Sequence, residues 1–205
     1  MPIEYSPSVV HSGLVLCLDA ANPRSYPGTG ANWYDISGQG NHHTLIASPT
    51  YASGKFTLDG STQGISRSAA MTGVSNFNTV VIWYSTTDAQ ELWTIGQTTS
   101  FYLSASTGVG NNYYHAACGA PTNYVDLVST VNPATPTNYR NGAYHMWEAK
   151  NVDFTTWTSY GWFNYGAPGA WCMAGSVAQI AIYNRPLLAE ESAQNFQAFR
   201  GRYGI

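Results

Sequence analysis

The segment at residues 33–45, WYDISGQGNHHTL, brings together a carboxylate, an amide-rich turn and two adjacent histidines. Its candidate metal donors are Asp35, Asn41, His42 and His43. Adjacent residues of an extended segment point to opposite sides, so the two histidines cannot easily hold one ion. Zinc takes three or four His, Cys or carboxylate ligands, and calcium takes several carboxylates and carbonyls. Asp35 is the only carboxylate within residues 33–45, although Asp59 could approach from a neighbouring strand. We therefore expect no metal and no cofactor, with calcium as an unsupported alternative.

A conformational role explains the same segment better. Asp, Ser and Asn side chains hydrogen-bond to nearby backbone, and Gly accepts left-handed geometry. The sequence therefore predicts a structural turn held by Asp35, Ser37, Gly38, Gly40, Asn41 and His43. Trp33 and Leu45 are expected to anchor the two ends of this turn in the core.

The chain shows no catalytic constellation. Glycoside hydrolysis needs two carboxylates flanking the sugar bond, about 5 to 9 Å apart. None of the 11 acidic residues forms a strand pattern of that kind, and Glu148 and Asp153 are separated by Lys150 and Asn151. There is no G-x-S-x-G elbow, and glycine pairs such as GVGNN lack the Lys-Ser/Thr of a phosphate loop. Cys118 follows His115 by three residues, a spacing that puts them on opposite faces of a strand. The sequence therefore predicts a protein that is not an enzyme.

Aromatic residues offer a binding surface of another kind. Their rings can stack on sugars while Asn and Ser meet the hydroxyls, but they equally form cores and subunit interfaces. We favour core and interface for most of them. The candidates kept for glycan or partner binding are Tyr113, Tyr114, Tyr160, Trp162, Asn164 and Tyr165.

Composition limits the classes of partner. Of 205 residues 9% are charged and 14% aromatic, and the formal net charge is −3. The 8 Lys and Arg residues form no cluster, so nucleic acid is not an expected partner. No apolar run is long enough for a membrane span, and the first residues lack the apolar core of a signal peptide. The three cysteines are expected to be buried free thiols.

Short β-branched and aromatic runs between Gly, Pro, Asn and Ser predict about ten strands and an all-β sandwich. Expected strands include residues 13–19, 55–60, 78–85, 91–96, 100–106, 123–129, 142–150, 157–166 and 176–184. Residues 187–201 predict a helix with Ala189, Ala193, Phe196 and Phe199 in one apolar stripe and Gly201 as its C-cap. Residues 1–12 read as an extended arm, and residues 13–205 as a single domain.

Both ends of the chain resemble a known family. GLVLCLDAANPRSYPGTGANWYDISGQGNHHTL, FTLDGS and IAIYNRPLLAEESAQNFQAFRGRYGI are similar to laminin-G-like, concanavalin A-like domains of tailed-phage structural proteins, especially marine and cyanobacterial ones. The resemblance implies a two-sheet antiparallel jelly-roll sandwich, neighbouring terminal strands and a C-terminal helix lying on the sandwich. It also implies a place in a virion; members of the wider superfamily often bind glycans, and some bind calcium.

Three departures from the family pattern stand out. His43 occupies a position where relatives tend to have Gly. Gln63 and Gly64 stand where a second Asp, a plausible cation ligand, is usual, which weakens the calcium alternative. Leu188 replaces the Ser expected at the N-cap of the helix, removing a capping bond worth about 1 kcal/mol.

These observations together predict a non-enzymatic virion structural protein, a capsid decoration or tail-associated subunit made in the host cytoplasm. Its expected partners are other virion proteins, in an oligomeric or multi-copy assembly, without nucleic acid or membrane. The alternative is a lectin-like module that binds a cell-surface glycan, and a glycoside hydrolase is the weakest of the three.

Overall fold

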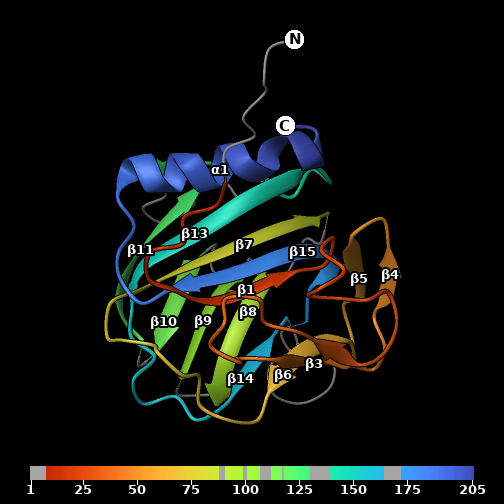
Figure 1. Cartoon of the computed structure of the whole chain (residues 1–205), viewed down its shortest axis with the longest axis horizontal. Helices are drawn as coiled ribbons and strands as arrows, with labels where there is room; N and C mark the ends of the chain where they lie inside the picture. The colour runs from red at the N-terminus through yellow and green to blue at the C-terminus, as the bar shows by residue number, and fades with distance from the viewer. Residues whose placement is uncertain are drawn as a thin grey trace.

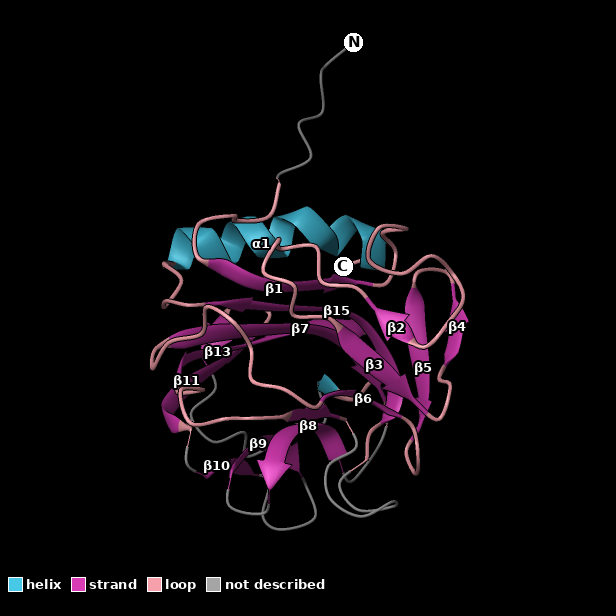
Figure 2. Cartoon of the chain, turned by 60° about the horizontal axis from the view of Figure 1, so that its bottom comes forward, coloured by secondary structure: helices cyan, strands magenta, loops and turns pink. Residues whose placement is uncertain are grey.

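A computed structural model describes residues 8–87, 91–98, 101–106, 112–116, 118–129, 139–163 and 172–205. In this part of the chain, antiparallel strands form two sheets and one α-helix follows them. The helix, an eight-stranded sheet and a seven-stranded sheet form three successive layers (Figure 2). The expected all-β, two-sheet antiparallel sandwich with one C-terminal helix is confirmed.

The eight-stranded sheet lies between the helix and the other sheet. Its order is β12 (Val128–Ser129), β11 (Gly119–Val125), β13 (Tyr144–Val152), β7 (Asn78–Thr86), β15 (Ala174–Tyr183), β5 (Lys55–Asp59) and β4 (Thr50–Ala52). β1 (Leu14–Asp19) also pairs with β15, so the first and last strands are neighbours, as the resemblance implies. The apolar run of β7 suits its central place, because β13 and β15 flank it on both sides.

The seven-stranded sheet forms the opposite layer. Its order is β10 (Asn112–Ala116), β9 (Phe101–Ser106), β8 (Glu91–Thr98), β14 (Tyr160–Trp162), β6 (Gly64–Arg67), β3 (His43–Ile46) and β2 (Asn32–Trp33). Alternate residues of the two sheets meet in the main core, which includes the fully buried Phe56, Ile82, Trp147, Trp162 and Ile180. Burial of these large side chains is the main stabilising contribution.

A second apolar cluster joins the helix to the outer face of the eight-stranded sheet. The helix, α1 (Ala189–Tyr203), lies across that face (Figure 1). Trp83 of β7 stacks on Phe196 at 5.6 Å between ring centroids and packs against Tyr203 at 5.0 Å. The helix therefore covers residues of β7 that would otherwise be an exposed apolar surface.

The predicted helix differs from the observed one in its end and in its buried face. α1 continues through Gly201 to Tyr203, and the residue that follows, Gly204, is the C-cap with a left-handed φ of 77°. The buried residues are Ser192, Asn195 and Phe199, whereas Ala189 is exposed, so the predicted apolar stripe is wrong in part. The helix has this mixed face because the sheet beneath it presents polar groups. Glu148 accepts a hydrogen bond from the Ser192 hydroxyl at 2.9 Å.

Leu188 supplies no side-chain cap, as expected. Glu191 instead accepts the Leu188 backbone N–H at 2.9 Å and forms a two-pronged ion pair with Arg185 at 2.6 and 2.7 Å. This ion pair lowers the pKa of Glu191 to about 2.

Two strand predictions also need correction. A regular strand over the expected residues 13–19 would place Leu14 on the same face as Leu16 and Leu18, but the register between β1 and β15 shifts there. Leu14 therefore packs with the helix cluster while the other two face the main core. Residues 123–129 were expected as one strand, but Asp126 and Leu127, with φ of 48° and 70°, turn the chain between β11 and β12.

The described part of the predicted arm, residues 8–12, lies against the helix. Val10 is buried, and its backbone N–H donates to the Asn195 side chain at 2.9 Å. Gln194 donates to the Ser8 carbonyl, and Arg185 donates to the Ser12 carbonyl. Residues 8–12 of the expected arm therefore contact the domain, and residues 1–7 lie outside the described residues.

Candidate functional site

The Asp35 turn has the conformational role that the sequence predicts. The Asp35 carboxylate accepts the backbone N–H groups of Cys17, Ser37 and Asn41, each at 2.9 Å, and the Ser37 hydroxyl at 2.9 Å. Gly38 and Gly40 have φ of 95° and 72°, which most other residues adopt only with strain. The carboxylate therefore fixes the turn against β1.

Asn41 extends this network across the sandwich. Its side-chain amide donates to the carbonyls of Val15 and Thr72 at 2.8 and 3.0 Å, and its oxygen accepts the Thr72 N–H at 2.9 Å. The expected core anchors at the two ends of the turn, Trp33 and Leu45, are both buried. Every polar atom of the Asn41 side chain is thus engaged in structure.

The two histidines point to opposite sides, as expected. His42 is exposed, and its Nδ1 accepts the Asp35 N–H at 3.0 Å. His43 is buried in β3, where its Nδ1 lies 2.9 Å from the Asn41 carbonyl, and its φ is not positive. Burial, partly offset by that carbonyl, lowers the pKa of His43 to about 4, so the ring is neutral near pH 7. A side chain therefore fits here because the position is the start of a strand.

The region of Asp59 and Gln63, where relatives suggested a cation, is closed by protein hydrogen bonds. Asp59 accepts the N–H groups of Ser61, Thr62 and Gln63, which lowers the pKa of its carboxyl well below the usual range. The Gln63 side-chain amide donates to the carbonyls of Ala47 and Ser48 at 3.3 and 3.4 Å. Among the described residues, no group of three or more His, Cys, Asp or Glu could hold a metal ion.

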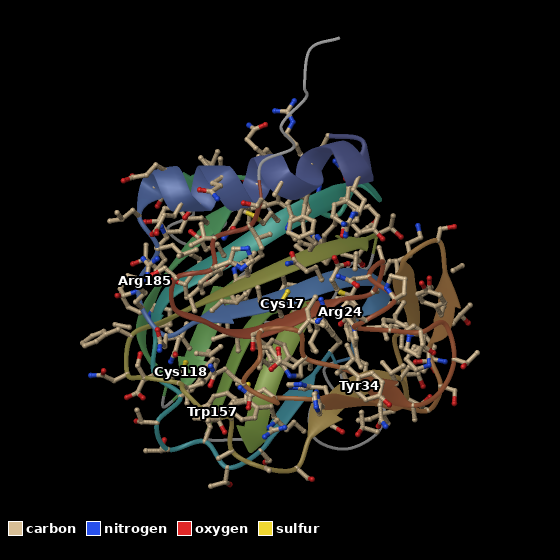
Figure 3. All side chains as sticks on the ribbon, viewed as in Figure 1. Cys17, Arg24, Tyr34, Cys118, Trp157 and Arg185 are labelled. Atoms are coloured by element: carbon tan, nitrogen blue, oxygen red, sulfur yellow. The ribbon has the colours of Figure 1, made fainter. Side chains whose placement is uncertain are left out.

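The cysteines are free and buried, as predicted. Burial raises the pKa of the Cys17 and Cys118 thiols to about 12, which keeps both protonated and unreactive near neutral pH. Figure 3 shows these two cysteines well apart in the sandwich.

Carboxylates of the described residues serve structural contacts. Glu148 is buried between Lys150, at 3.2 Å, and Ser192, and burial raises its pKa. Asp153 instead accepts the N–H and hydroxyl of Thr155. The remaining partners are Arg202 for Asp19, the turn amides for Asp35 and Asp59, His145 for Asp126, and Arg185 for Glu191. Of the carboxylates whose side chains are described, only Glu190, exposed in the first turn of α1, makes no contact of this kind.

Two of the six residues predicted to bind a glycan or partner are contradicted by their burial. Tyr160 and Trp162 are 1% and 0% exposed, because both belong to the main core, so they cannot stack on a ligand at the surface. Tyr113 and Tyr114 belong to β10, where their backbone is in register with Ala105 and Ser104, and their side chains lie outside what the structure describes. Asn164 and Tyr165 lie outside the described residues.

Sequence reasoning missed the aromatic residue that the turn segment itself exposes. Tyr34, labelled in Figure 3, follows the buried Trp33. Its exposed fraction is 38%. Its ring meets the edge of His42 at 5.5 Å between centroids, and its hydroxyl lies 3.5 Å from the Asn32 amide. Strand alternation after Trp33 was the signal that could have found it.

A cavity of about 380 Å³ lies near this segment. Its lining residues are Tyr26, Gly30, Ala31, Leu45, Ser48 and Pro49, and we refer to it as the Tyr26 cavity. None of them is charged. The described residues therefore form an uncharged depression between the loop before β2 and the turn after β3.

Comparisons with known proteins place the chain by fold alone. No protein-family model and no curated protein matches it. Domain 4 of AbnA, a GH43 extracellular arabinanase from Geobacillus stearothermophilus, in complex with arabinotriose, superposes with a TM-score of 0.57 at 15% identity. The match covers 91% of this chain and 98% of that domain.

Two further structures share the fold. Trypanosoma rangeli sialidase in complex with sialic acid gives a TM-score of 0.54 at 16% identity, over 92% of this chain and 33% of the sialidase. The receptor binding domain of botulinum neurotoxin C/D mosaic serotype gives 0.52 at 10% identity, over 91% of this chain and 51% of that one. The chain thus spans about a third of the sialidase. No helix in the described part of the chain has the length and apolarity needed to cross a membrane.

Proposed function

We propose that this chain is a non-catalytic structural protein of a tailed-phage particle, a capsid decoration or tail-associated subunit that acts by protein–protein contact. The observation that carries the non-catalytic part is the structural engagement of the described carboxylates, Glu190 excepted. A glycosidase needs one carboxylate free to donate a proton and another free to attack or to activate water. Carboxylates used in turns and ion pairs do not supply that pair.

The phage assignment rests on the resemblance of the two terminal segments. In the fold they form one unit, because β1 pairs with β15 and the helix that follows β15 covers their outer face. A low-charge chain, with 9% Asp, Glu, Lys and Arg, also suits broad contacts with other proteins. The expected setting is a multi-copy assembly in a virion.

The direct test is to find the chain in purified particles from the phage or lysogen that carries its gene. Mass spectrometry should detect it at a fixed copy number, and cryo-electron microscopy should place the sandwich on the head or the tail. Its absence from intact, infectious particles would overturn the proposal.

A truncation tests the hypothesis that the N-terminus docks the subunit. Deleting residues 1–7 keeps every contact described for residues 8–12, so the domain should stay folded. The shortened chain is expected to lose incorporation into particles. Incorporation at the normal copy number would remove the N-terminus from the docking surface.

A second candidate function is glycan recognition. The observation that favours it is Tyr34, an exposed aromatic ring beside the exposed Asn32 and His42. A ring next to amide and imidazole groups can hold both the apolar face and the hydroxyls of a sugar. A glycan array probed with the whole chain, with calcium present, should give hits, and an empty array would count against this function.

A further inference from the structure

We propose that the Tyr26 cavity is a binding site for a neutral saccharide. This inference rests on the second candidate function, glycan recognition, and gives it a place on the molecule and a chemical class of ligand. The cavity, about 380 Å³, is within the size range of small-molecule sites.

The cavity has an apolar floor and a polar rim. Tyr26, Leu45 and Pro49 are buried and form the floor. The exposed Gly30, Ala31 and Ser48 form the rim, which offers backbone groups and one hydroxyl. A sugar ring has one face of C–H groups and a periphery of hydroxyls, so it matches this division.

The floor is rigid. The Tyr26 ring meets Tyr51 and Phe56 edge-on, with centroid distances of 4.8 and 4.7 Å. Its hydroxyl donates to the Gly30 carbonyl at 3.1 Å and closes the loop above it. The Leu45 N–H donates to the Ala31 carbonyl at 2.7 Å and ties that loop to β3. A floor and loop held in this way need little ordering when a ligand enters.

The opposite wall contains residues with a strained backbone conformation. Ala47 and Ser48 have φ of 53° and 51°, two consecutive left-handed residues that are not glycine. Such residues are uncommon and persist only where the surroundings hold them. The Gln63 side chain does so by donating to both carbonyls, and Asp59 in turn accepts the Gln63 N–H at 3.0 Å. The strained turn therefore places Ser48 at the cavity rim.

None of the six described lining residues carries a charge, and this favours one class of ligand. A carboxylated or phosphorylated sugar would lose hydration on entering and would gain no cationic partner from these six residues. A neutral sugar loses less hydration free energy on entering, and its hydroxyls can replace hydrogen bonds to water with hydrogen bonds to the rim. Binding of a neutral sugar should also be insensitive to ionic strength, since no ion pair is screened.

The test uses saturation-transfer NMR on the full chain with defined sugars. The neutral probes are glucose, galactose, mannose, N-acetylglucosamine, lactose and maltose, and the acidic probes are glucuronic acid and N-acetylneuraminic acid. At least one neutral probe should bind, equally at low and high NaCl. Ala31→Trp fills the cavity from its exposed rim and should abolish binding, whereas Ala189→Trp, on the exposed start of α1, should not.

A second pair of variants probes the strained turn. Ser48→Ala removes the rim hydroxyl and should weaken binding about fivefold. Ala47→Ser adds a hydroxyl at the neighbouring left-handed position, outside the lining, and should leave binding unchanged.

The outcomes separate this proposal from the function on which it rests. Sugar binding that survives Ala31→Trp would overturn the cavity assignment and leave glycan recognition standing, with Tyr34 as the next position to vary. Binding restricted to the acidic probes would overturn the neutral class. No binding to any probe, together with an empty glycan array, would overturn both.

Discussion

Replacing Asp35 by alanine tests whether one buried carboxylate fixes the turn at residues 35–41. The carboxylate accepts four hydrogen bonds, and two of the donors, the N–H groups of Cys17 and Asn41, are buried. A buried donor left without its partner costs about 1–3 kcal/mol, so two of them predict a loss near 4 kcal/mol. The Ser37 donors are partly exposed and recover hydrogen bonds to water.

Asp59 provides a matched control for this reasoning. Its carboxylate also accepts four hydrogen bonds, three from backbone N–H groups and one from the Thr62 hydroxyl, but all of them are exposed. Asp59→Ala should therefore cost about 1 kcal/mol, as for exposed caps. Asp35→Asn should fall between the two, at about 2 kcal/mol, because one oxygen remains while the new amide group faces a donor.

Urea unfolding followed by tryptophan fluorescence measures the difference. With a slope of about 2 kcal/mol/M, Asp35→Ala should lower the midpoint by about 2 M and Asp59→Ala by about 0.5 M. Equal losses for the two variants would refute the argument, because burial of the donors would then have no influence on the free energy of unfolding.

Three further predictions concern other parts of the molecule. Burial lowers the pKa of His43 from the ordinary 6.5 to about 4. As the pH falls from 6.5 to 4, the unfolded chain therefore binds a proton that the folded chain does not, and the free energy of unfolding should fall by up to about 3 kcal/mol. In pH-dependent urea titrations His43→Phe should flatten this slope and His42→Gln should keep it. Leu127→Gly should raise the melting temperature by about 2–4 °C in calorimetry, because the Leu127 backbone is in the left-handed region with φ of 70°. A melting temperature below that of the unchanged chain would contradict this. Asn195→Ala should cost about 2 kcal/mol in urea unfolding, since its buried side chain holds the N-terminal segment and β15, while the exposed Gln197→Ala should cost less than about 0.5 kcal/mol.

The strands were predictable because burial of one face of a sheet makes apolar residues recur at every second position. Phe56 and Leu58 alternate with exposed neighbours in β5, and β7 is apolar on both faces because the other sheet lies on one side and the helix on the other. The Asp35 turn was predictable for a different reason. Asp and Asn side chains bond to their own backbone, so the pattern of residues determines the conformation locally.

The errors have a common physical cause, which is that partners distant in sequence decide the outcome. α1 buries Ser192 and Asn195 because Glu148 and the Val10 N–H lie beneath them, which no helical period reveals. Trp162 belongs to the core because of its place in β14, although the local sequence looks equally suited to a surface.

The strained turn at Ala47 and Ser48 shows the same limit in the candidate site. Neither residue type signals a left-handed backbone, and the cause lies in Gln63, whose amide donates to both carbonyls. In the sequence, Gln63 registers only as a missing cation ligand. In the structure its side-chain amide donates to the two carbonyl oxygens of the turn. The residue type at position 63 therefore affects the conformation of Ser48, which lines the Tyr26 cavity. A Gln63→Ala variant therefore removes the support of that wall, and a sugar that binds there should respond to it as it does to Ser48→Ala.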